Sequence, residues 1–528
     1  MPELGRAARL AVAVSSAAAL AVLAGCTYHY GPKSTSAGGQ GGSGGGTSAT
    51  APASQAALHW RACGSGGPHL RCGRIQVPLS YADPNARKIT LALTEVPATA
   101  PVSQQQGILL VNPGGPGGSG TSLASFVAQG LSPSVAAEYD IIGFDPRGVG
   151  ASVPSMQCEP SFFSRARPDY IPASQGAEQV QINRAKTYAA DCEKKYGWLL
   201  PYMTTENVAR DMDKIRAAMD QPKLNYLGFS YGTYLGQVYA TLFPGRVRRM
   251  VLDSTVNPDG VWYADNISQD YAFQGRMNAF LAWMAKYNGL YHLGSTVAEV
   301  RASWYQARNK LLAHPVRNSA GVPVLGADEY DDTMLIGGYD NGYWPGLAAA
   351  LASYLHVGGT SQLMTLYNQA GKQGENEFAV YNAVECADVA WPRNFAKWNS
   401  DVRKVYATAP VEAWDNLWFN AACAFWPVHG PVKPLKIGAP GLPGILMLQG
   451  TLDPATPYAG ALVAHRLLPT SKMVVVEGSG NHGQSLAYPP NTCVNGYLDR
   501  YLATGALPKG PGPVNATCAT LPAPVPSG

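Results

Sequence analysis

The sequence predicts an α/β fold, in which helices cover both faces of a mostly parallel central sheet and a helical domain is inserted between two strands. Short apolar segments alternate with helical patterns, as expected for a parallel sheet that is buried on both faces. Residues 259–430 contain most of the tryptophans and no comparable series of strands. Because this interval is too long for a loop in a compact domain, it predicts an inserted helical lid domain.

The predicted strands lie on both sides of the lid, at residues 89–97, 107–111, 139–144, 224–227, 248–252, 444–448 and 473–476. The first five fall in a first core part, residues 58–258, and the last two in a second core part, residues 431–528. Ligands of open α/β sheets bind outside the carboxyl ends of the strands, where the lid would also lie. The functional residues are therefore expected in the loops that follow the strands.

Ser230 is the predicted nucleophile, because it stands where a strand passes directly into a helix. An apolar run ends at Gly228, the motif Gly228-Phe-Ser230-Tyr-Gly232 follows, and a helical pattern continues to Pro244. This context is typical of a nucleophile elbow, in which close glycines accommodate a strained serine. The same five-residue pattern occurs in the linker at residues 41–45, so the flanking strand and helix carry the prediction. The alternative is an ordinary serine in a βα turn.

Two backbone amides are predicted to stabilise a developing oxyanion. The first belongs to Tyr231, which follows the nucleophile, and the second to a loop after an early strand. The glycine-rich segment at residues 111–118, VNPGGPGG, lies at that point, and Gly115 is the predicted donor. A phosphate-binding loop is the competing interpretation, but the segment lacks both the GK[ST] ending and the GxGxxG spacing.

The acid and the base are expected after the lid, in the chain order Ser, Asp, His. Asp453 follows the strand at residues 444–448, and His482 lies in a glycine-rich loop after the last predicted strand. His482 would accept the serine proton, while Asp453 would fix the imidazole tautomer and stabilise the imidazolium. His465 also follows Asp453, but its surroundings predict a helix and a structural role.

The N-terminus predicts export and a lipid anchor. Residues 1–25 have two arginines, an alanine-rich apolar segment and a small-residue ending before Cys26, which resembles a lipoprotein signal peptide. Acylation of Cys26 with two or more chains would anchor the chain to the extracytoplasmic face of a membrane. Residues 26–57 are rich in Gly, Ser and Thr and predict a flexible tether. The alternative is a plain signal peptide that happens to precede a cysteine.

The remaining eight of the nine cysteines predict disulfides, since an even number in an exported chain is typical of them. They fall into four sequence-neighbouring pairs: Cys63 with Cys72, Cys158 with Cys192, Cys386 with Cys423, and Cys493 with Cys518. No CxxC or HExxH motif indicates a metal site, and no cofactor is expected. The formal charge of +4, or +3 without the two arginines and one glutamate of residues 1–25, is too small to indicate nucleic-acid binding.

These motifs together resemble α/β-hydrolases of the proline iminopeptidase type, and most closely the secreted bacterial tripeptidyl aminopeptidases. The resemblance rests on GGPG at residues 114–117, FDPRG at 144–148, the elbow, TLDPATP at 451–457 and GSGNHG at 478–483, and it extends from Trp60 to Cys518. It implies an α/β-hydrolase fold with a lid, an acyl-enzyme reaction on peptides with free N-termini, and a triad at Ser230, Asp453 and His482. Asn112-Pro113 replaces the histidine that many iminopeptidases have before the glycine pair, which favours the tripeptidyl branch.

A free N-terminal ammonium needs a carboxylate partner when it is partly removed from water. Glu385 and Asp388, in the lid segment NAVECADVAWP, are the predicted partners. The competing interpretation is structural, because Cys386 lies between them and Asp388 could cap a turn. Asp145 and Arg147, in FDPRG, are expected to order a loop near the site.

Three functions remain open from the sequence. The leading one is a cell-surface serine aminopeptidase that releases short peptides, including tripeptides, from the N-terminus of a peptide or protein. The second is a hydrolase of carboxylic or lipid esters that uses the same triad, since one fold serves both chemistries. The third is a lipoprotein that binds peptides without turnover, although such a protein would have no need of all three triad residues.

Overall fold

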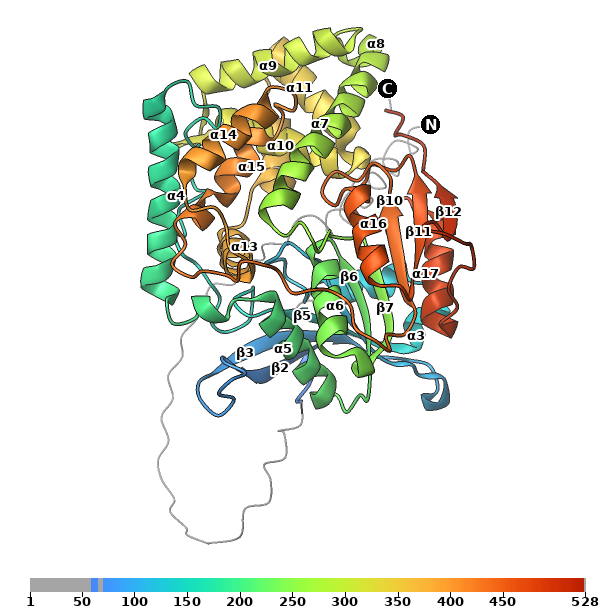
Figure 1. Ribbon diagram of the computed structural model, residues 1–528. Coiled ribbons are helices and arrows are strands. Elements are labelled where there is room, and N and C mark those ends of the chain that lie inside the picture. The colour runs from blue at the N-terminus through green and yellow to red at the C-terminus, as the bar shows by residue number, and fades with distance from the viewer. Residues whose placement is uncertain (1–57, 65–69, 527–528) are drawn as a thin grey trace.

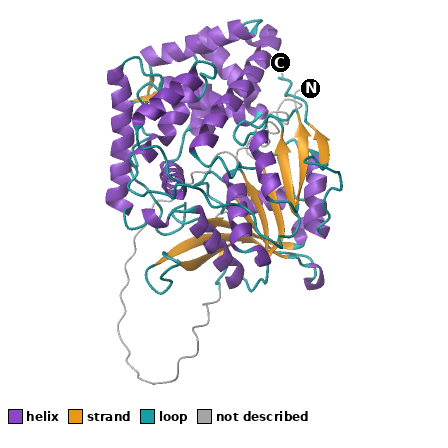
Figure 2. Cartoon of the chain, viewed as in Figure 1, coloured by secondary structure: helices purple, strands orange, loops and turns teal. Residues whose placement is uncertain are grey.

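The computed structural model describes residues 58–64 and 70–526, so the predicted signal peptide, Cys26 and the tether lie outside the described residues. The strands gather on one side of the molecule and a thick layer of helices lies over one end of them (Figure 1). Figure 2 shows the same division, with strands in one half and mostly helices in the other. Strands from both core parts join in one sheet.

The sheet has the order β1-β2-β3-β5-β4-β6-β7-β10-β11-β12. Pairing is antiparallel from β1 to β5 through β2 and β3, and parallel from β5 to β12. The strands are β1 (Arg61–Ala62), β2 (Arg71–Pro78), β3 (Lys88–Val96), β4 (Gly107–Asn112), β5 (Tyr139–Asp145), β6 (Leu224–Phe229), β7 (Val247–Asp253), β10 (Ile445–Gly450), β11 (Ser471–Glu477) and β12 (Ala516–Ala519).

The predicted α/β-hydrolase fold class is confirmed, and every predicted strand is present. The sequence patterns missed three edge elements, β1, β2 and β12. Strand β2 alternates polar and apolar residues and is partly exposed, so it lacks the continuous apolar run of the inner strands. Strands β1 and β12 are too short to give a pattern.

Successive residues of the inner strands enter two separate cores, because side chains alternate across a sheet. Leu110 packs into the core beneath α5 (Thr205–Ala218), α6 (Tyr231–Leu242) and α16 (Tyr458–Leu467). Leu109 packs into the opposite core beneath α2 (Leu123–Gly130), α3 (Pro133–Ala137) and α17 (Thr492–Thr504). Three 3₁₀ turns link these elements: η1 (Val102–Gln104), η2 (Leu200–Tyr202) and η3 (Pro244–Arg246).

The chain between β7 and β10 forms the helical lid. Its helices are α7 (Tyr263–Lys286), α8 (Asn288–Tyr291), α9 (Val297–Ala313), α10 (Ala327–Tyr339), α11 (Trp344–Val357), α12 (Ser361–Leu366), α13 (Glu375–Asp388), α14 (Phe395–Tyr406) and α15 (Ala413–Asn420). Shorter elements are η4 (Asn341–Tyr343), η5 (Tyr367–Gly371), η6 (Ala421–Ala424) and a hairpin of β8 (Val316–Arg317) and β9 (Pro323–Leu325). The lid has its own aromatic core, which includes Phe280 stacked on Trp344.

The helical layer also contains a segment that the sequence prediction assigned to the first core part. Helix α4 (Gln175–Tyr196) stands beside the lid helices rather than against the sheet (Figure 1). Before α4, Phe162 stacks on Phe378 of α13, and the Trp418 indole donates to the carbonyl of Tyr170 at 2.8 Å. Helix α4 has a polar sequence without a clear apolar stripe, so its pattern gave no sign that it would leave the sheet.

All four disulfides join the expected partners, at Cys63–Cys72, Cys158–Cys192, Cys386–Cys423 and Cys493–Cys518. The second disulfide joins the segment before α4 to α4 itself, and the third joins α13 to η6 within the lid. Within residues 58–64 and 70–526, no helix has both the length and the apolar character needed to cross a bilayer.

Candidate active site

Ser230 occupies a sharp turn between β6 and α6. Its backbone has φ 56° and ψ −127°, a left-handed conformation that is unfavourable for a residue with a side chain. The flanking glycines permit this turn, because a Cβ at Gly228 would lie 2.4 Å from the Gly232 carbonyl oxygen. A Cβ at Gly232 would lie 2.8 Å from the Asn112 carbonyl oxygen on the neighbouring loop. The strand-turn-helix geometry is that of a nucleophile elbow.

The predicted oxyanion loop begins beside the elbow, because β4 and β6 are parallel neighbours and Asn112 is paired with Gly228. Asn112 Oδ1 accepts a hydrogen bond of 3.0 Å from the Gly114 amide, which turns the loop inward. Gly115 has φ 108°, and a Cβ on Gly114 would lie 3.0 Å from the Tyr231 nitrogen. Gly115 and Tyr231, which carry the two predicted amide donors, line the same cavity as Ser230. Their role as an oxyanion hole stays a prediction.

Asp453 and His482 come together from the loops after β10 and β11, which are parallel neighbours. His482 Nδ1 lies 3.0 Å from each carboxylate oxygen of Asp453. Asp453 also accepts bonds from the amides of Ala455 and Thr456, both at 3.1 Å, so its carboxylate is held in one orientation. Burial lowers the pKa of His482, but the charge and hydrogen bond of Asp453 outweigh this effect and raise it above its usual value.

The His482 imidazole and the Ser230 side chain line one cavity. In the described part of the chain, the hydrogen bonds of His482 reach Asp453 and the lid but not the Ser230 hydroxyl. Such a bond often forms only when substrate is bound. The arrangement can perform nucleophilic chemistry with the imidazole as base, and the triad assignment itself stays a prediction.

A second buried aspartate, which the sequence analysis missed, anchors the histidine loop. Asp253, at the end of β7, accepts bonds of 2.8 Å from the amides of Gln484 and Ser485. Burial raises its pKa to about 6, against the lowering effect of these bonds. The Gly483 amide also donates to Ser254 Oγ at 2.8 Å. The sequence did contain a signal for Asp253, because an acidic residue stands at the end of a buried strand.

The lid binds the other side of the histidine loop. The His482 amide donates to the Tyr339 carbonyl at 2.7 Å, at the end of α10. Asn481 Oδ1 accepts from Arg276 at 2.9 Å and from the Asn341 amide at 3.1 Å. Its amide nitrogen donates to Asp340 at 3.0 Å. The position of His482 therefore depends on the lid. No sequence pattern indicated this dependence.

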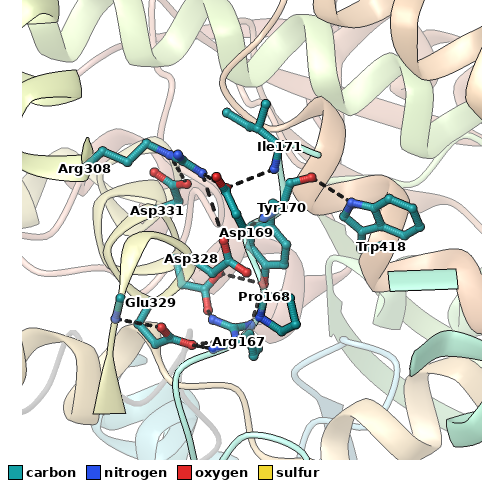
Figure 3. A network of polar contacts seen from close by, with 12 residues as sticks. Arg167, Pro168, Asp169, Tyr170, Ile171, Arg308, Asp328, Glu329, Asp331 and Trp418 are labelled. Carbon is teal, nitrogen blue, oxygen red and sulfur yellow. Dashed lines mark hydrogen bonds and ion pairs between the residues drawn. The ribbon is translucent and has the colours of Figure 1, made fainter. Parts of the chain in front are cut away.

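The shared cavity has a volume of about 440 Å³ and lies between the strand ends and the lid. Its wall is strongly acidic and carries six carboxyl groups: Asp265, Asp332, Glu377, Glu385, Glu412 and Asp415. Arg167 also lines it, but this arginine pairs with Glu329 at 2.8 Å and with Asp332. Figure 3 shows Arg167 turned toward Glu329 within a network that joins the segment before α4 to α10. The cavity is therefore suited to a cationic ligand.

The two predicted amine-binding carboxylates have different positions. Glu385 lines the cavity, is buried, and accepts a hydrogen bond from Asn266 at 3.5 Å. Asp388 is absent from the wall, since its carboxylate accepts bonds from the Thr205 amide and hydroxyl, at 2.7 and 2.5 Å, at the start of α5. These contacts favour the structural alternative for Asp388, and its amine-binding role stays a prediction. Burial raises the pKa of both carboxyl groups, to about 7 for Asp388 and well above the usual range for Glu385.

The FDPRG segment has the ordering role expected of it. Arg147 is fully buried and pairs with Asp211 through two bonds of 2.8 Å, at a distance from the cavity wall. Asp145 accepts bonds from Ser119 at 2.6 Å and from the Ala151 amide at 2.8 Å. In the described part of the chain, no three histidine, cysteine or acidic side chains converge as a metal site requires.

Residues 107–487 match the family described as the alpha/beta hydrolase fold. The chain is 39% identical over 486 residues to a tripeptidyl aminopeptidase of Streptomyces coelicolor, and the match covers 89% of this chain and 87% of that protein. It is 31% identical over 486 residues to the serine protease Hip1 of Mycobacterium bovis, covering 87% and 91%. It is also 30% identical over 465 residues to the carboxylesterase B of Mycobacterium tuberculosis, covering 85% and 86%.

Proposed function

Since this chain belongs to the alpha/beta hydrolase fold family and is a serine hydrolase similar to tripeptidyl aminopeptidases, we propose that it releases short peptides, tripeptides in particular, from free N-termini. The observation that carries the proposal is the acidic cavity that lies over Ser230 beneath the lid. An enclosed site admits a chain end more readily than the middle of a folded chain. An acidic wall favours an end that carries an ammonium group.

In the proposed reaction, Ser230 Oγ attacks the scissile carbonyl carbon while His482 Nε2 accepts the hydroxyl proton. The amides of Gly115 and Tyr231 stabilise the oxyanion that forms. The carbon–nitrogen bond then breaks as His482 returns its proton to the leaving amine. Water repeats the sequence on the acyl-enzyme, which releases the peptide as a carboxylic acid and restores the Ser230 hydroxyl.

Glu385 is the proposed partner of the substrate ammonium. It lies on the cavity wall, comes from lid helix α13 and has no cationic partner among residues 58–64 and 70–526. Its buried carboxyl group would bind the substrate ammonium as an ion pair. Losing one member of such a buried pair costs about 3–5 kcal/mol, or at least about a hundredfold in kcat/KM.

The test compares free and N-acetylated tripeptide amides. The wild type should cleave the free peptide at least about a hundredfold faster, and Glu385→Gln should remove most of that difference. Asp388→Asn is the matched control, because Asp388 binds Thr205 away from the cavity, and it should preserve the ratio. Equal rates on the free and acetylated peptides in the wild type would reject the exopeptidase function.

We also propose that the enzyme acts at the cell surface, anchored through Cys26. The support is the lipoprotein-type ending before Cys26 and the tether that follows. Cys26→Ala should move the protein from the membrane fraction to the soluble fraction without changing the rate on a soluble peptide. An unchanged membrane fraction would reject the anchor.

A carboxylic-ester hydrolase is the second candidate, favoured by the similarity to carboxylesterase B. The same triad would cleave an ester without an ammonium group. An ester hydrolase would retain full activity in Glu385→Gln, and its preferred substrate would be a neutral ester rather than a peptide amide.

A further inference from the structure

Glu412 is a buried carboxylate that the fold does not use. It precedes α15 as its N-cap residue, but its side chain makes no capping hydrogen bond. It lines the cavity and is 7% exposed, and its Oε2 has no hydrogen-bond partner among the described residues. Leaving a buried acceptor unpaired is costly, and a charged one more so. This group is therefore available to a ligand that enters the cavity.

Glu412 has two acidic neighbours, and we call these three residues (Asp270, Glu412 and Asp415) the Glu412 cluster. Asp415 lies in the first turn of α15 and also lines the cavity. Asp270, on α7, accepts a hydrogen bond of 2.9 Å from Asn416. Burial first, and then the charges of Asp270 and Asp415, raise the pKa of Glu412. Each additional carboxylate makes an incoming cation more favourable.

The nearby arginines are already committed to other carboxylates. Arg167 pairs with Glu329 and Asp332, and Arg308 pairs with Asp169 at 2.5 Å and with Asp331 at 2.7 Å. Figure 3 shows both guanidinium groups enclosed in this network. Within the described ranges, no lysine or arginine forms a salt bridge with the Glu412 cluster. In this part of the chain Glu412 therefore has no ion-pair partner, and the charge of Arg167 acts on Asp415 without a salt bridge.

Glu412 and Glu385 have different acidic neighbours. The charges of Asp270 and Asp415 raise the pKa of Glu412, whereas the charges of Asp388 and Asp265 raise the pKa of Glu385. The two groups also come from different helices, α15 and α13. The cavity wall therefore presents carboxyl groups from two lid helices, which we take as places for two cationic groups.

We propose that Glu412 and Asp415 bind the cationic side chain of a lysine or arginine in the peptide that is released. The proposal rests on the proposed function and deepens it, because the α-ammonium would bind Glu385 while the side chain reaches α15. Lysine and arginine carry their charge on long flexible stems, which suits a second site within one cavity. A volume of about 440 Å³ lies in the range of pockets that enclose a whole small ligand.

The test uses aminomethylcoumarin amides of tripeptides with free N-termini. One residue is lysine or its uncharged analogue norleucine, at each of the three positions in turn, and the other two are alanine. The wild type should prefer lysine over norleucine by at least tenfold in kcat/KM at one position. Glu412→Gln should reduce that preference below threefold. Equal rates for lysine and norleucine at every position would overturn the proposal.

Asp415→Asn should weaken the same preference, and Glu193→Gln, on the exposed face of α4, is the charge-matched control that should preserve it. If Glu412→Gln does not fold, Asp415→Asn and calorimetric binding of the two peptides to Ser230→Ala decide the question. A preference that survives in both cavity variants would overturn the proposal.

The ratio of free to acetylated norleucine peptides reports on the proposed function alone. If that ratio is one while the lysine preference holds and depends on Glu412, the exopeptidase function fails and the side-chain site stands. If Glu412→Gln removes the free-to-acetylated ratio instead, the cluster binds the α-ammonium and the side-chain assignment is wrong.

Discussion

Replacing Asn481 by alanine tests whether the lid sets the position of His482. The change removes the hydrogen bonds to Arg276, Asp340 and the Asn341 amide, which are 2.9 to 3.1 Å long. Bonds to charged groups contribute about 1.5–3 kcal/mol each and neutral ones about 1 kcal/mol. The direct bond from the His482 amide to Tyr339 remains and still holds the histidine loop. We therefore expect only part of the energy of the lost bonds to appear in catalysis, as a rise of about 1.4–2.8 kcal/mol in the activation free energy.

This loss should appear as a fall of about tenfold to a hundredfold in kcat on a free tripeptide amide, with little change in KM. Steady-state kinetics measure both parameters, and thermal unfolding checks that the variant is folded at the assay temperature. Asn183→Ala is the matched control, since Asn183 is exposed on α4 and bonds with Gln179 of the same helix. A kcat within twofold of wild type in folded Asn481→Ala would refute the positioning role.

Three further predictions concern the His482–Asp453 pair, the Arg147–Asp211 pair and the Cys386–Cys423 disulfide. In the proposed mechanism His482 must be neutral to accept a proton, and Asp453 raises its pKa despite burial, so kcat/KM should fall as the pH drops through that raised pKa. In Asp453→Asn the acid limb of the pH–rate profile should move to lower pH while kcat falls by about 10⁴-fold. An acid limb that does not move would contradict the pairing of His482 with Asp453. Asp211→Ala leaves the Arg147 guanidinium buried without its partner and should lower the free energy of unfolding by about 3–5 kcal/mol in a denaturant titration, whereas a loss below about 1 kcal/mol would show that the pair is not stabilising. Reduction of Cys386–Cys423 should destabilise the lid by about 2–4 kcal/mol and lower activity in proportion, and full activity after its selective removal would contradict the coupling of lid and site.

The inner sheet could be predicted from the sequence because its strands are buried on both faces and are therefore continuous apolar runs. The turn at Ser230 was predictable for a related reason, since strand, glycine pair and helix follow one another within a short segment. By contrast, β2 is half exposed and α4 is polar, so neither the edge of the sheet nor the early contribution to the helical layer had a distinct pattern.

The lid side of the site depends on contacts between distant segments, which periodicity does not describe. Asp388 and Glu385 are three residues apart on α13, yet Asp388 bonds with Thr205 and Glu385 faces the cavity. Glu412 lies in a segment with no motif, and its significance comes from a buried position without a partner. Asn481 directly precedes His482, but its contacts with Arg276 and Asp340 exist only because the lid folds over the core.

The central claim is that Ser230 is a nucleophile activated by His482 beneath the lid. The most direct measurement is covalent labelling with a fluorophosphonate, followed by mass spectrometry of the digested protein. We predict one adduct on Ser230 at stoichiometric yield, slow labelling in His482→Ala, and no adduct in Ser230→Ala. An adduct on another residue, or undiminished labelling of Ser230→Ala, would contradict the claim.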